Sequence, residues 1–254
     1  MSRMTDPTSP GTGALRAVTD SIHDARPRRP EDIDDPDVPV AATVVLLRDS
    51  ARGPEVLMMQ RPDRGSFAGA WVFPGGRIEP SDAVGADDSE PVIARRAGVR
   101  ETFEEVGIAL DPQHLVPMSR WDPPPGIALR IRTWFFAAHA VETRVVPSAE
   151  EVVSAQWLPP EEVLQRHARG EVMLYPPTWV TLHGLSGQDD AEAALAVVRM
   201  RGVEEFQTIA AQTPGGTVLL WHGDAEYAEF GAGAASARHR LETGSLPWRY
   251  VRTD

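Results

Sequence analysis

The chain has 254 residues, a formal net charge of −12 and no cysteine, which excludes disulfide and thiolate chemistry. The acidic balance argues against a nucleic-acid partner or an anionic membrane surface, but not against nucleotides, which bind through a metal and a local pocket. No apolar run reaches transmembrane length and no hydrophobic signal segment opens the sequence, so we expect a cytoplasmic protein without membrane contact.

Residues 1–36 are rich in Pro, Arg, Asp and Ser and poor in apolar side chains. Such a composition is typical of a segment that cannot bury enough apolar surface to fold. We therefore expect a disordered leader, in which Arg26, Arg28 and Arg29 are solvated. Phosphate binding by these arginines is the less favoured alternative.

A globular domain is expected over residues 37–200. The dense run of β-branched residues at 40–47 predicts a buried strand, and residues 55–60 predict the next strand. A short strand at residues 71–73 then leads into a pair of glycines. This order of elements predicts a β-sheet that is already formed before the first long helix begins.

The pair Gly75 and Gly76 precedes an acidic helix, which we expect to end at Gly107. Glycine lets the backbone turn tightly and approach a phosphate or a helix closely, so both glycines are candidates for substrate binding. At 100° per residue, one side of the helix carries larger apolar residues, which predicts a core-facing stripe of Val92, Val99, Phe103 and Val106.

Three carboxylates, those of Glu101, Glu104 and Glu105, lie on the opposite side of this helix at the spacing i, i+3 and i+4. Their mutual repulsion costs stability unless a cation neutralises them, and oxygen ligands suit a hard ion, Mg²⁺ or Mn²⁺. The alternative is a solvated acidic face. Small residues on the acidic side, such as Ala97 and Gly98, favour a metal site because they indicate that another element packs close to it.

The stretch resembles the signature of the Nudix hydrolases, which is Gly, five residues, Glu, seven residues, then Arg-Glu-apolar-x-Glu-Glu-x-Gly-apolar. Gly76 matches the first glycine, and the second half matches without a gap at Arg100, Glu101, Glu104, Glu105, Gly107 and Ile108. The chain departs from the signature in three ways. Asp82 stands at the first Glu position, Thr102 stands at an apolar position, and about ten extra residues follow Asp82.

The resemblance implies a fold and a set of roles. The fold would be the α/β Nudix fold, a mixed β-sheet sandwiched between helices, which we expect to be extended by a strand-rich segment at residues 201–254 packed on the domain. Divalent metal binding would fall to Glu101, Glu104, Glu105 and Asp82. Arg100 would orient a carboxylate, and the loop with Glu150 and Glu151 offers candidates for a general base.

Four arginines are candidates for binding substrate phosphates. Arg61 and Arg64 are the nearest cations upstream of the glycine pair. Arg130 and Arg132 alternate with apolar neighbours in a predicted strand at residues 127–141, so they share one face of it. Each of the four has an alternative role as an ordinary surface charge.

The remaining elements follow from shorter apolar runs. We expect strands at residues 152–158, 206–210, 218–221 and 248–251 and helices at residues 160–167 and 189–199. Between them, Tyr175 and Trp179 would either stack on a nucleobase or pack into the core, and packing is the favoured interpretation.

Further features resemble the coenzyme A and acyl-coenzyme A diphosphatase branch of the family. These features are Arg61 at a strand end, Gly69 three residues before Phe-Pro-Gly-Gly, Asp82, the interrupted signature and Gly223-Asp224. The implied reaction yields 3′,5′-ADP and (acyl-)phosphopantetheine. Alternatives are NADH, ADP-ribose or another dinucleotide or sugar nucleotide as substrate, or a nucleotide sensor without turnover. The expected partner is therefore a small nucleotide diphosphate, and a homodimer is left open.

Overall fold

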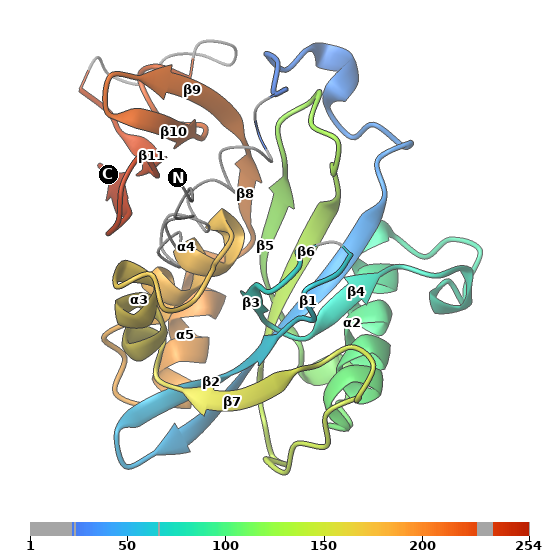
Figure 1. Ribbon diagram of the computed structural model, residues 1–254. Helices are drawn as coiled ribbons and strands as arrows, with labels where there is room; N and C mark the ends of the chain where they lie inside the picture. The colour runs from blue at the N-terminus through green and yellow to red at the C-terminus, as the bar shows by residue number, and fades with distance from the viewer. Residues whose placement is uncertain (1–21, 23, 66, 228–235, 254) are drawn as a thin grey trace, which may run out of the picture.

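The computed structural model describes residues 22, 24–65, 67–227 and 236–253. Figure 1 shows a central β-sheet with α2 on one side and α3, α4 and α5 on the other. The helices are α2 (Glu90–Val106), α3 (Pro160–Ala168), α4 (Pro176–Leu185) and α5 (Ala191–Arg201). Within the described ranges, no helix has both the length and the apolar composition needed to cross a bilayer.

The main sheet is mixed, as expected. Its strands are β1 (Val40–Ser50), β2 (Gly53–Gln60), β3 (Trp71–Val72), β4 (Gly75–Arg77), β5 (Val116–Asp122), β6 (Arg132–His139), β7 (Ser154–Leu158) and β8 (Glu204–Gln207). The order is β3-β2-β1-β6-β5-β8, with β4 paired to β1 and β7 paired to β2. The pairs β1–β6 and β5–β8 are parallel, and the other pairs are antiparallel.

Strand β1 shows why helices cover both faces of the sheet. Its side chains alternate, so Val44 and Leu46 join the core cluster under α2, whereas Val45 and Leu47 join the cluster on the side of α5. All four are fully buried. A strand that is apolar on both faces needs a cover on each, which explains the sandwich of helices that the sequence predicts.

Helix α2 packs with a different side than we expected from its larger apolar residues. Val92 and Phe103 are 38% and 59% exposed, whereas Ala94, Ala97 and Gly98 are buried. A Cβ atom at Gly98 would lie 2.9 Å from Cγ2 of Val44, so the helix approaches β1 more closely than large side chains permit. The predicted apolar stripe is wrong for Val92 and Phe103, whereas Val106 is buried and Val99 is partly buried against the same core. The close packing inferred from the small residues is confirmed.

A second, antiparallel sheet follows β8 and packs beside the main sheet (Figure 1). Its strands are β9 (Ile209–Thr213), β10 (Gly216–Leu220), β11 (His239–Glu242) and β12 (Arg249–Arg252). Trp121 of β5 stacks on Phe206 of β8 at 3.9 Å between ring centroids, and Trp221 meets both rings edge-on. Since β8 belongs to the main sheet, the boundary expected near residue 200 does not separate the two sheets.

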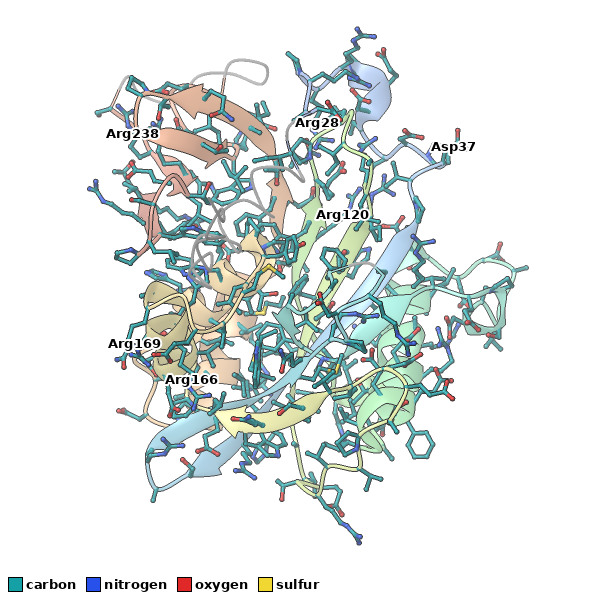
Figure 2. The ribbon with its side chains drawn as sticks, viewed as in Figure 1. Arg28, Asp37, Arg120, Arg166, Arg169 and Arg238 are labelled. Atoms are coloured by element: carbon teal, nitrogen blue, oxygen red, sulfur yellow. The ribbon has the colours of Figure 1, made fainter. Side chains whose placement is uncertain are left out.

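The end of the expected leader is packed against the domain. Arg28 is 2% exposed and its guanidinium lies 2.7 Å from the carboxylate of Asp122, while Asp32, in the short 3-10 helix Pro30–Asp32, is 4% exposed. In Figure 2, Arg28 lies between the N-terminal segment and the second sheet, whereas Arg166 and Arg169 lie at the periphery beside α3. The prediction of a solvated leader is therefore wrong for Arg28 and Asp32, which are buried in ion pairs, whereas the Arg29 side chain is 64% exposed as expected. Residues 1–21 and 23 lie outside the described residues.

The strand expected at residues 127–141 is shorter in the structure, because β6 begins only at Arg132. The preceding residues 123–131 form a loop rich in proline, which cannot donate to a strand ladder. This loop lies beside the cavity that contains the acidic helix residues.

Candidate active site

The glycine pair allows three elements to meet at one point. β4 pairs with β1 so that Gly75 lies opposite Thr43 and Gly76 opposite Ala42. A Cβ at Gly75 would lie 2.7 Å from Cα of Thr43, which is a severe overlap. A Cβ at Gly76 would collide with the carboxylate of Glu101. Both glycines are therefore needed for the close approach of β4 to β1 and α2.

Two of the three helix carboxylates, those of Glu101 and Glu105, line a cavity beside the glycine pair. Glu105 is 2% exposed, and one of its carboxylate oxygens accepts a hydrogen bond of 2.8 Å from the Gly75 N–H. Burial raises the pKa of Glu105 to about 8 despite this bond, and the neighbouring charges of Glu101 and Glu151 act in the same direction. Burial likewise raises the pKa of Glu101. The cavity thus contains two carboxylates that lack sufficient positive charge.

Arg100 connects Glu101, which lines the cavity, to two carboxylates outside it. Its guanidinium donates two bonds of 3.1 Å to Asp82, one of 2.9 Å to Glu101 and one of 3.0 Å to Glu104. Asp82 is 5% exposed; burial would raise its pKa, but the bonds from Arg100 and the Glu79 N–H outweigh burial and hold the pKa below its ordinary value. Arg100 is thus placed to orient carboxylates.

Asp82 and Glu104 lie apart from the cavity that contains Glu101 and Glu105. Both oxygens of Asp82 accept bonds from Arg100, and Asp82 does not line the cavity. The side chain of Glu104 is 52% exposed and also pairs with Arg100. The structure therefore does not gather the four expected ligands around one point.

The loop before β7 brings one of its two acidic residues into the cavity. Glu151 lines it, and its charge acts on both Glu101 and Glu105. Glu150 does not line the cavity, and its backbone carbonyl accepts a 3.0 Å bond from Arg64. Of the two candidates for a general base, Glu151 has the better position.

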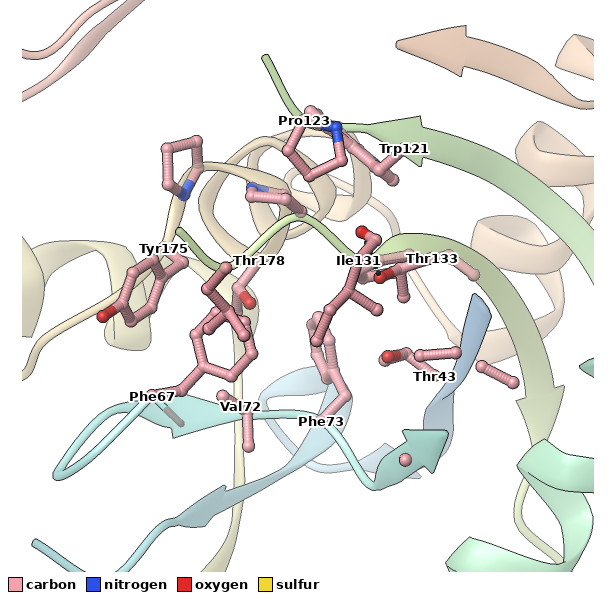
Figure 3. Close-up of a pocket in the computed structure, with 18 of the residues that line it drawn as sticks. Thr43, Phe67, Val72, Phe73, Trp121, Pro123, Ile131, Thr133, Tyr175 and Thr178 are labelled. Carbon is pink, nitrogen blue, oxygen red and sulfur yellow. Dashed lines mark hydrogen bonds between the residues drawn. The ribbon is translucent and has the colours of Figure 1, made fainter. Parts of the chain in front are cut away.

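The cavity has a volume of about 490 Å³ and two chemically distinct ends. The polar end contains Glu101, Glu105, Glu151 and Arg61. The other end is mostly apolar and is lined by Phe67, Trp121, Pro123, Pro124, Ile127, Leu129, Ile131, Phe135, Tyr175 and Leu219. Figure 3 shows Phe67 and Tyr175 on one side of this space and Ile131 and Thr133 across from them.

Phe67 and Tyr175 form an edge-to-face pair at 4.8 Å between ring centroids. Phe67 has a φ of 59°, in the left-handed region that bulky residues rarely adopt. Backbone strain of this kind persists only where the surroundings enforce it, and it is frequent at ligand sites. Trp179, the other aromatic residue considered for base stacking, is 6% exposed and lies near Trp248, as expected for a core residue.

The four candidate arginines are not equivalent. Arg61 lines the cavity 3.6 Å from Glu105, whereas Arg64 is bonded to the loop at Glu150. The proposed contact of Arg130 and Arg132 with phosphate is wrong. Arg130 pairs with Asp122 and Asp35, and Arg132, 3% exposed, pairs with Glu90.

Arg77 and the apolar wall were missed in the sequence. Arg77 lines the cavity directly after Gly76, so its position beside the signature glycine was an available signal. The apolar wall comes from segments between residues 22 and 219, and no local pattern marks residues that meet only in the folded chain.

The site fits a divalent cation, although not through a dense ligand cluster. Glu101 and Glu105 supply hard oxygen donors to the cavity, and burial, which raises the pKa of Glu105, makes its charged form costly unless a cation compensates it. Among the described residues, no group of three His, Cys, Asp or Glu side chains is arranged to hold a metal. Two protein carboxylates are nevertheless a usual protein contribution to Mg²⁺ binding, because water and substrate phosphates complete the octahedron.

Comparison with known protein families matches residues 37–176 to the NUDIX domain, which is more than half of the chain. The chain belongs to the Nudix family. The stretch around Gly76, Arg100 and Glu105, which resembles the Nudix signature, lies within the matched residues. The match also confirms the expected class of enzyme, a pyrophosphohydrolase of nucleoside diphosphate-linked compounds, in a family that generally uses divalent metal ions.

Individual relatives agree with the family. The CTP pyrophosphohydrolase of Escherichia coli K12 is 32% identical over 114 residues, which are 45% of this chain and 73% of that protein. A probable nudix hydrolase of Schizosaccharomyces pombe is 34% identical over 34% of this chain, but over only 27% of its own length. Among solved structures, a NUDIX hydrolase from Alicyclobacillus acidocaldarius has a TM-score of 0.56 and 27% identity, over 63% of this chain and 96% of that chain.

Proposed function

We propose that this Nudix enzyme hydrolyses the diphosphate of coenzyme A or acyl-coenzyme A, which releases 3′,5′-ADP and (acyl-)phosphopantetheine. The observation that supports this proposal best is the two-ended cavity. Its polar end suits a diphosphate with a metal ion, and its apolar end, lined by many apolar side chains, suits a substrate with a large, weakly polar group beyond the diphosphate.

Glu101 and Glu105 would hold the Mg²⁺ or Mn²⁺ ion. When bound, such an ion neutralises the diphosphate and lowers the pKa of a coordinated water. The Gly75 N–H fixes the direction of one Glu105 oxygen, and Arg100 fixes Glu101. The metal-binding roles expected for Glu104 and Asp82 stay predictions, since both contact Arg100 outside the cavity.

The other charged residues of the cavity complete the proposed mechanism. Glu151 would accept the proton of the attacking water, because it is the acidic residue of the β7 loop that lines the cavity. Arg61 and Arg77 would contact phosphate oxygens, for which a guanidinium offers two parallel donors. Without Arg130 and Arg132, these two arginines are also the cavity's candidates for the 3′-phosphate of coenzyme A.

A second candidate function is cleavage of NADH or ADP-ribose, whose diphosphate joins two ring-bearing groups. The Phe67–Tyr175 pair supports it, because exposed aromatic edges and faces can contact a second ring. These compounds have no 3′-phosphate on the adenosine, which separates them from coenzyme A.

The decisive experiment compares coenzyme A, 3′-dephospho-coenzyme A, NADH, ADP-ribose and CTP with Mg²⁺ or Mn²⁺, with products resolved by chromatography. A charge-assisted contact to the 3′-phosphate is worth roughly 1.5–3 kcal/mol, so its loss should lower kcat/KM about ten- to a hundredfold. Equal rates on both forms of coenzyme A, or faster cleavage of NADH, ADP-ribose or CTP, would refute the proposed substrate.

Two variants connect this discrimination to the structure. Arg77→Gln should reduce the preference for coenzyme A over its dephospho form if Arg77 contacts the 3′-phosphate, and Arg61→Gln makes the same test at the other position. Arg169→Gln is the matched control, since Arg169 is 55% exposed, pairs with Glu171 and does not line the cavity. A preference that survives both cavity substitutions would exclude these arginines as its source.

A further inference from the structure

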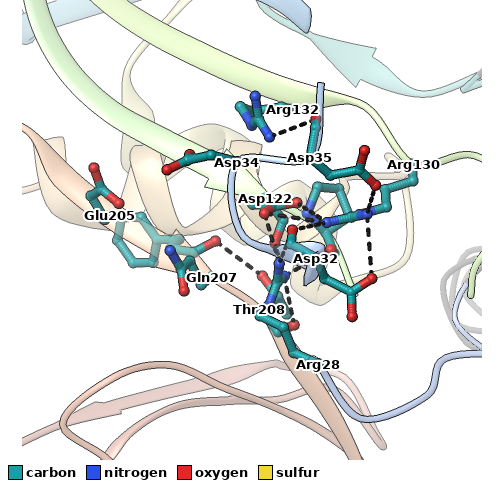
Figure 4. A network of polar contacts seen from close by, with 12 residues as sticks. Arg28, Asp32, Asp34, Asp35, Asp122, Arg130, Arg132, Glu205, Gln207 and Thr208 are labelled. Atoms are coloured by element: carbon teal, nitrogen blue, oxygen red, sulfur yellow. Dashed lines mark hydrogen bonds and ion pairs between the residues drawn. The ribbon is translucent and has the colours of Figure 1, made fainter. Parts of the chain in front are cut away.

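The apolar end of the cavity is held in place from outside by one buried arginine. Arg28 donates from one terminal nitrogen to the backbone carbonyls of Asp122 at 3.1 Å, Pro123 at 3.0 Å and Thr208 at 3.4 Å. Its other terminal nitrogen lies 2.7 Å from a carboxylate oxygen of Asp122. Pro123 and Thr208 both line the cavity, so Arg28 joins two of its walls (Figure 4).

The chain on either side of Arg28 strengthens this connection. The Arg26 N–H donates a 2.9 Å bond to the carbonyl of Pro125, and Ile22 lines the cavity itself. A Cβ at Gly126, which has a φ of 89°, would lie 2.6 Å from the carbonyl oxygen of Asp24. The N-terminal segment therefore lies directly against the loop at residues 123–131.

The loop depends on these contacts because it has little regular structure of its own. It contributes Pro123, Pro124, Ile127, Leu129 and Ile131 to the apolar wall. Prolines supply no N–H donors, so backbone hydrogen bonds can hold Pro123 and Pro124 only through their carbonyls. An arginine is suited to this task because its planar guanidinium offers five donors, whereas a lysine ammonium is a compact point charge.

Arg28 also belongs to a buried network of charged side chains. Asp122 is 2% exposed and receives a second cation, Arg130, at 3.2 Å. Arg130 in turn donates to the carbonyl of Asp32 at 2.8 Å, which returns the network to the N-terminal segment (Figure 4). The network thus ties the segment, the end of β5 and the start of β9 into one unit.

We propose that Arg28 is a positioning residue for the apolar end of the cavity and determines how tightly the enzyme binds the part of its substrate beyond the diphosphate. This proposal rests on the proposed function for the identity of the substrate. Arg28 touches neither the glycine pair nor the acidic end, so its loss should weaken substrate binding and leave the chemical step largely intact.

The test compares Arg28→Gln, Arg28→Lys and the control Arg29→Gln in the full chain. Arg29 is the neighbouring residue, with a side chain that is 64% exposed and a loose contact to Glu31. For the panel compound that the wild type cleaves fastest, Arg28→Gln should raise KM about tenfold while kcat changes less than about twofold. Arg28→Lys should fall between, and Arg29→Gln should match the wild type.

Hydrogen exchange provides a readout that is independent of activity. The Arg26 N–H donates to the carbonyl of Pro125, and the Thr208 N–H donates to the carbonyl of Asp122. Both amides therefore report on the cavity walls that Arg28 contacts. Exchange at both should accelerate in Arg28→Gln and not in Arg29→Gln. If Arg28→Gln fails to fold because Asp122 loses one of its two cations, the pair Arg28→Gln/Asp122→Asn removes the charges of both partners, and Arg130 keeps its ion pair with Asp35.

Unchanged exchange at these amides would overturn the proposal that Arg28 holds the cavity walls in position. Accelerated exchange with an unchanged KM, or a lower kcat at an unchanged KM, would overturn the role in substrate binding. A wild type that neither cleaves nor binds any compound of the panel would refute the proposed function and the substrate part of this proposal. Hydrogen exchange would still decide whether Arg28 holds the cavity walls in position.

Discussion

The backbone N–H of Gly75 donates a 2.8 Å hydrogen bond to the buried carboxylate of Glu105, thirty residues along the chain. This bond joins the first and last parts of the Nudix signature across the sequence that interrupts it. The bond fixes the orientation of the Glu105 carboxylate. Burial raises the pKa of this group to about 8, so its charged form is unfavourable without a cation. A buried carboxylate whose charged form is unfavourable in the absence of a cation is a candidate for metal binding.

Replacing Glu105 tests whether its buried carboxylate lowers the stability of the metal-free protein and is required for activity. Glu105→Gln should abolish turnover and raise the melting temperature of the metal-free protein, because the amide needs no counter-charge and its oxygen can still accept the Gly75 N–H. Thermal unfolding in EDTA and phosphate-release assays would measure both effects.

Glu104→Gln is the matched control for the stability effect. It should also lower turnover, as the family signature implies, but its half-exposed side chain predicts no stabilisation without metal. Wild-type activity in both variants would refute the assignment of these glutamates, and equal stabilisation by both would refute the role of burial.

The space at Gly76 leads to a second prediction. Gly76→Ala places a methyl group against the carboxylate of Glu101, which must then rotate away from the cavity. We expect kcat/KM to fall at least about tenfold, with a stability loss of roughly 1–3 kcal/mol from overpacking. Gly215→Ala is the control, since its nearest neighbour would be 3.7 Å away. Normal activity in Gly76→Ala would show that Glu101 does not need its observed position.

The strand β1 and the signature were predictable because both are local patterns, and the mixed sheet was expected from the family resemblance that the signature carries. The β-branched run of β1 and the spacing from Arg100 to Ile108 each involve neighbouring residues. The orientation of α2 was not predictable from hydrophobicity alone, because Gly98 lies against Val44 whereas Phe103 is exposed. A helix that packs closely on a sheet needs small side chains at the contact, even where larger apolar side chains are available on another side of the helix.

Arg28 and Arg130 show why the outer parts of the site escaped prediction. Arg28 is surrounded locally by proline and charge, which predicts exposure, whereas Arg130 alternates with apolar neighbours, which predicted a strand instead of the observed loop. Their partner Asp122 is 94 residues from Arg28, and a buried ion pair of that separation leaves no periodic signal. The same reason applies to the apolar wall of the cavity, which is assembled from distant segments.

Asp224 leads to a prediction about the second sheet. It is fully buried and accepts bonds from Arg240 at 2.5 and 2.7 Å and from the His239 N–H at 2.8 Å. Asp224→Asn leaves Arg240 buried without its main counter-charge, so we expect a loss of roughly 3–5 kcal/mol by urea denaturation. Glu226→Gln, at the exposed end of the same arginine, should cost about 1 kcal/mol or less. Equal losses would show that burial does not determine the strength of this pair.

His167 leads to a prediction about the dependence of stability on pH. It lies in α3, is 1% exposed and packs edge-on against Trp248 at 4.5 Å, and within the described chain neither ring nitrogen has a hydrogen-bond partner. Burial lowers its pKa to about 4, below the ordinary value of 6.5. The unfolded chain therefore binds the proton first, so this residue's contribution is complete above pH 6.5 and is lost as the pH falls towards 4.

The expected loss from His167 between pH 7.5 and 4.5 is roughly 2–3 kcal/mol, from the difference between the two pKa values. His167→Phe keeps a ring against Trp248 but cannot titrate. The free energy of unfolding in urea should therefore fall less between pH 7.5 and 4.5 in this variant than in the wild type, and the difference between the two should be roughly 2–3 kcal/mol. His139→Phe, at a side chain that is 49% exposed, is the control for a general effect of losing a histidine. An identical pH dependence in the wild type and His167→Phe would mean that His167 is protonated in the folded protein without cost.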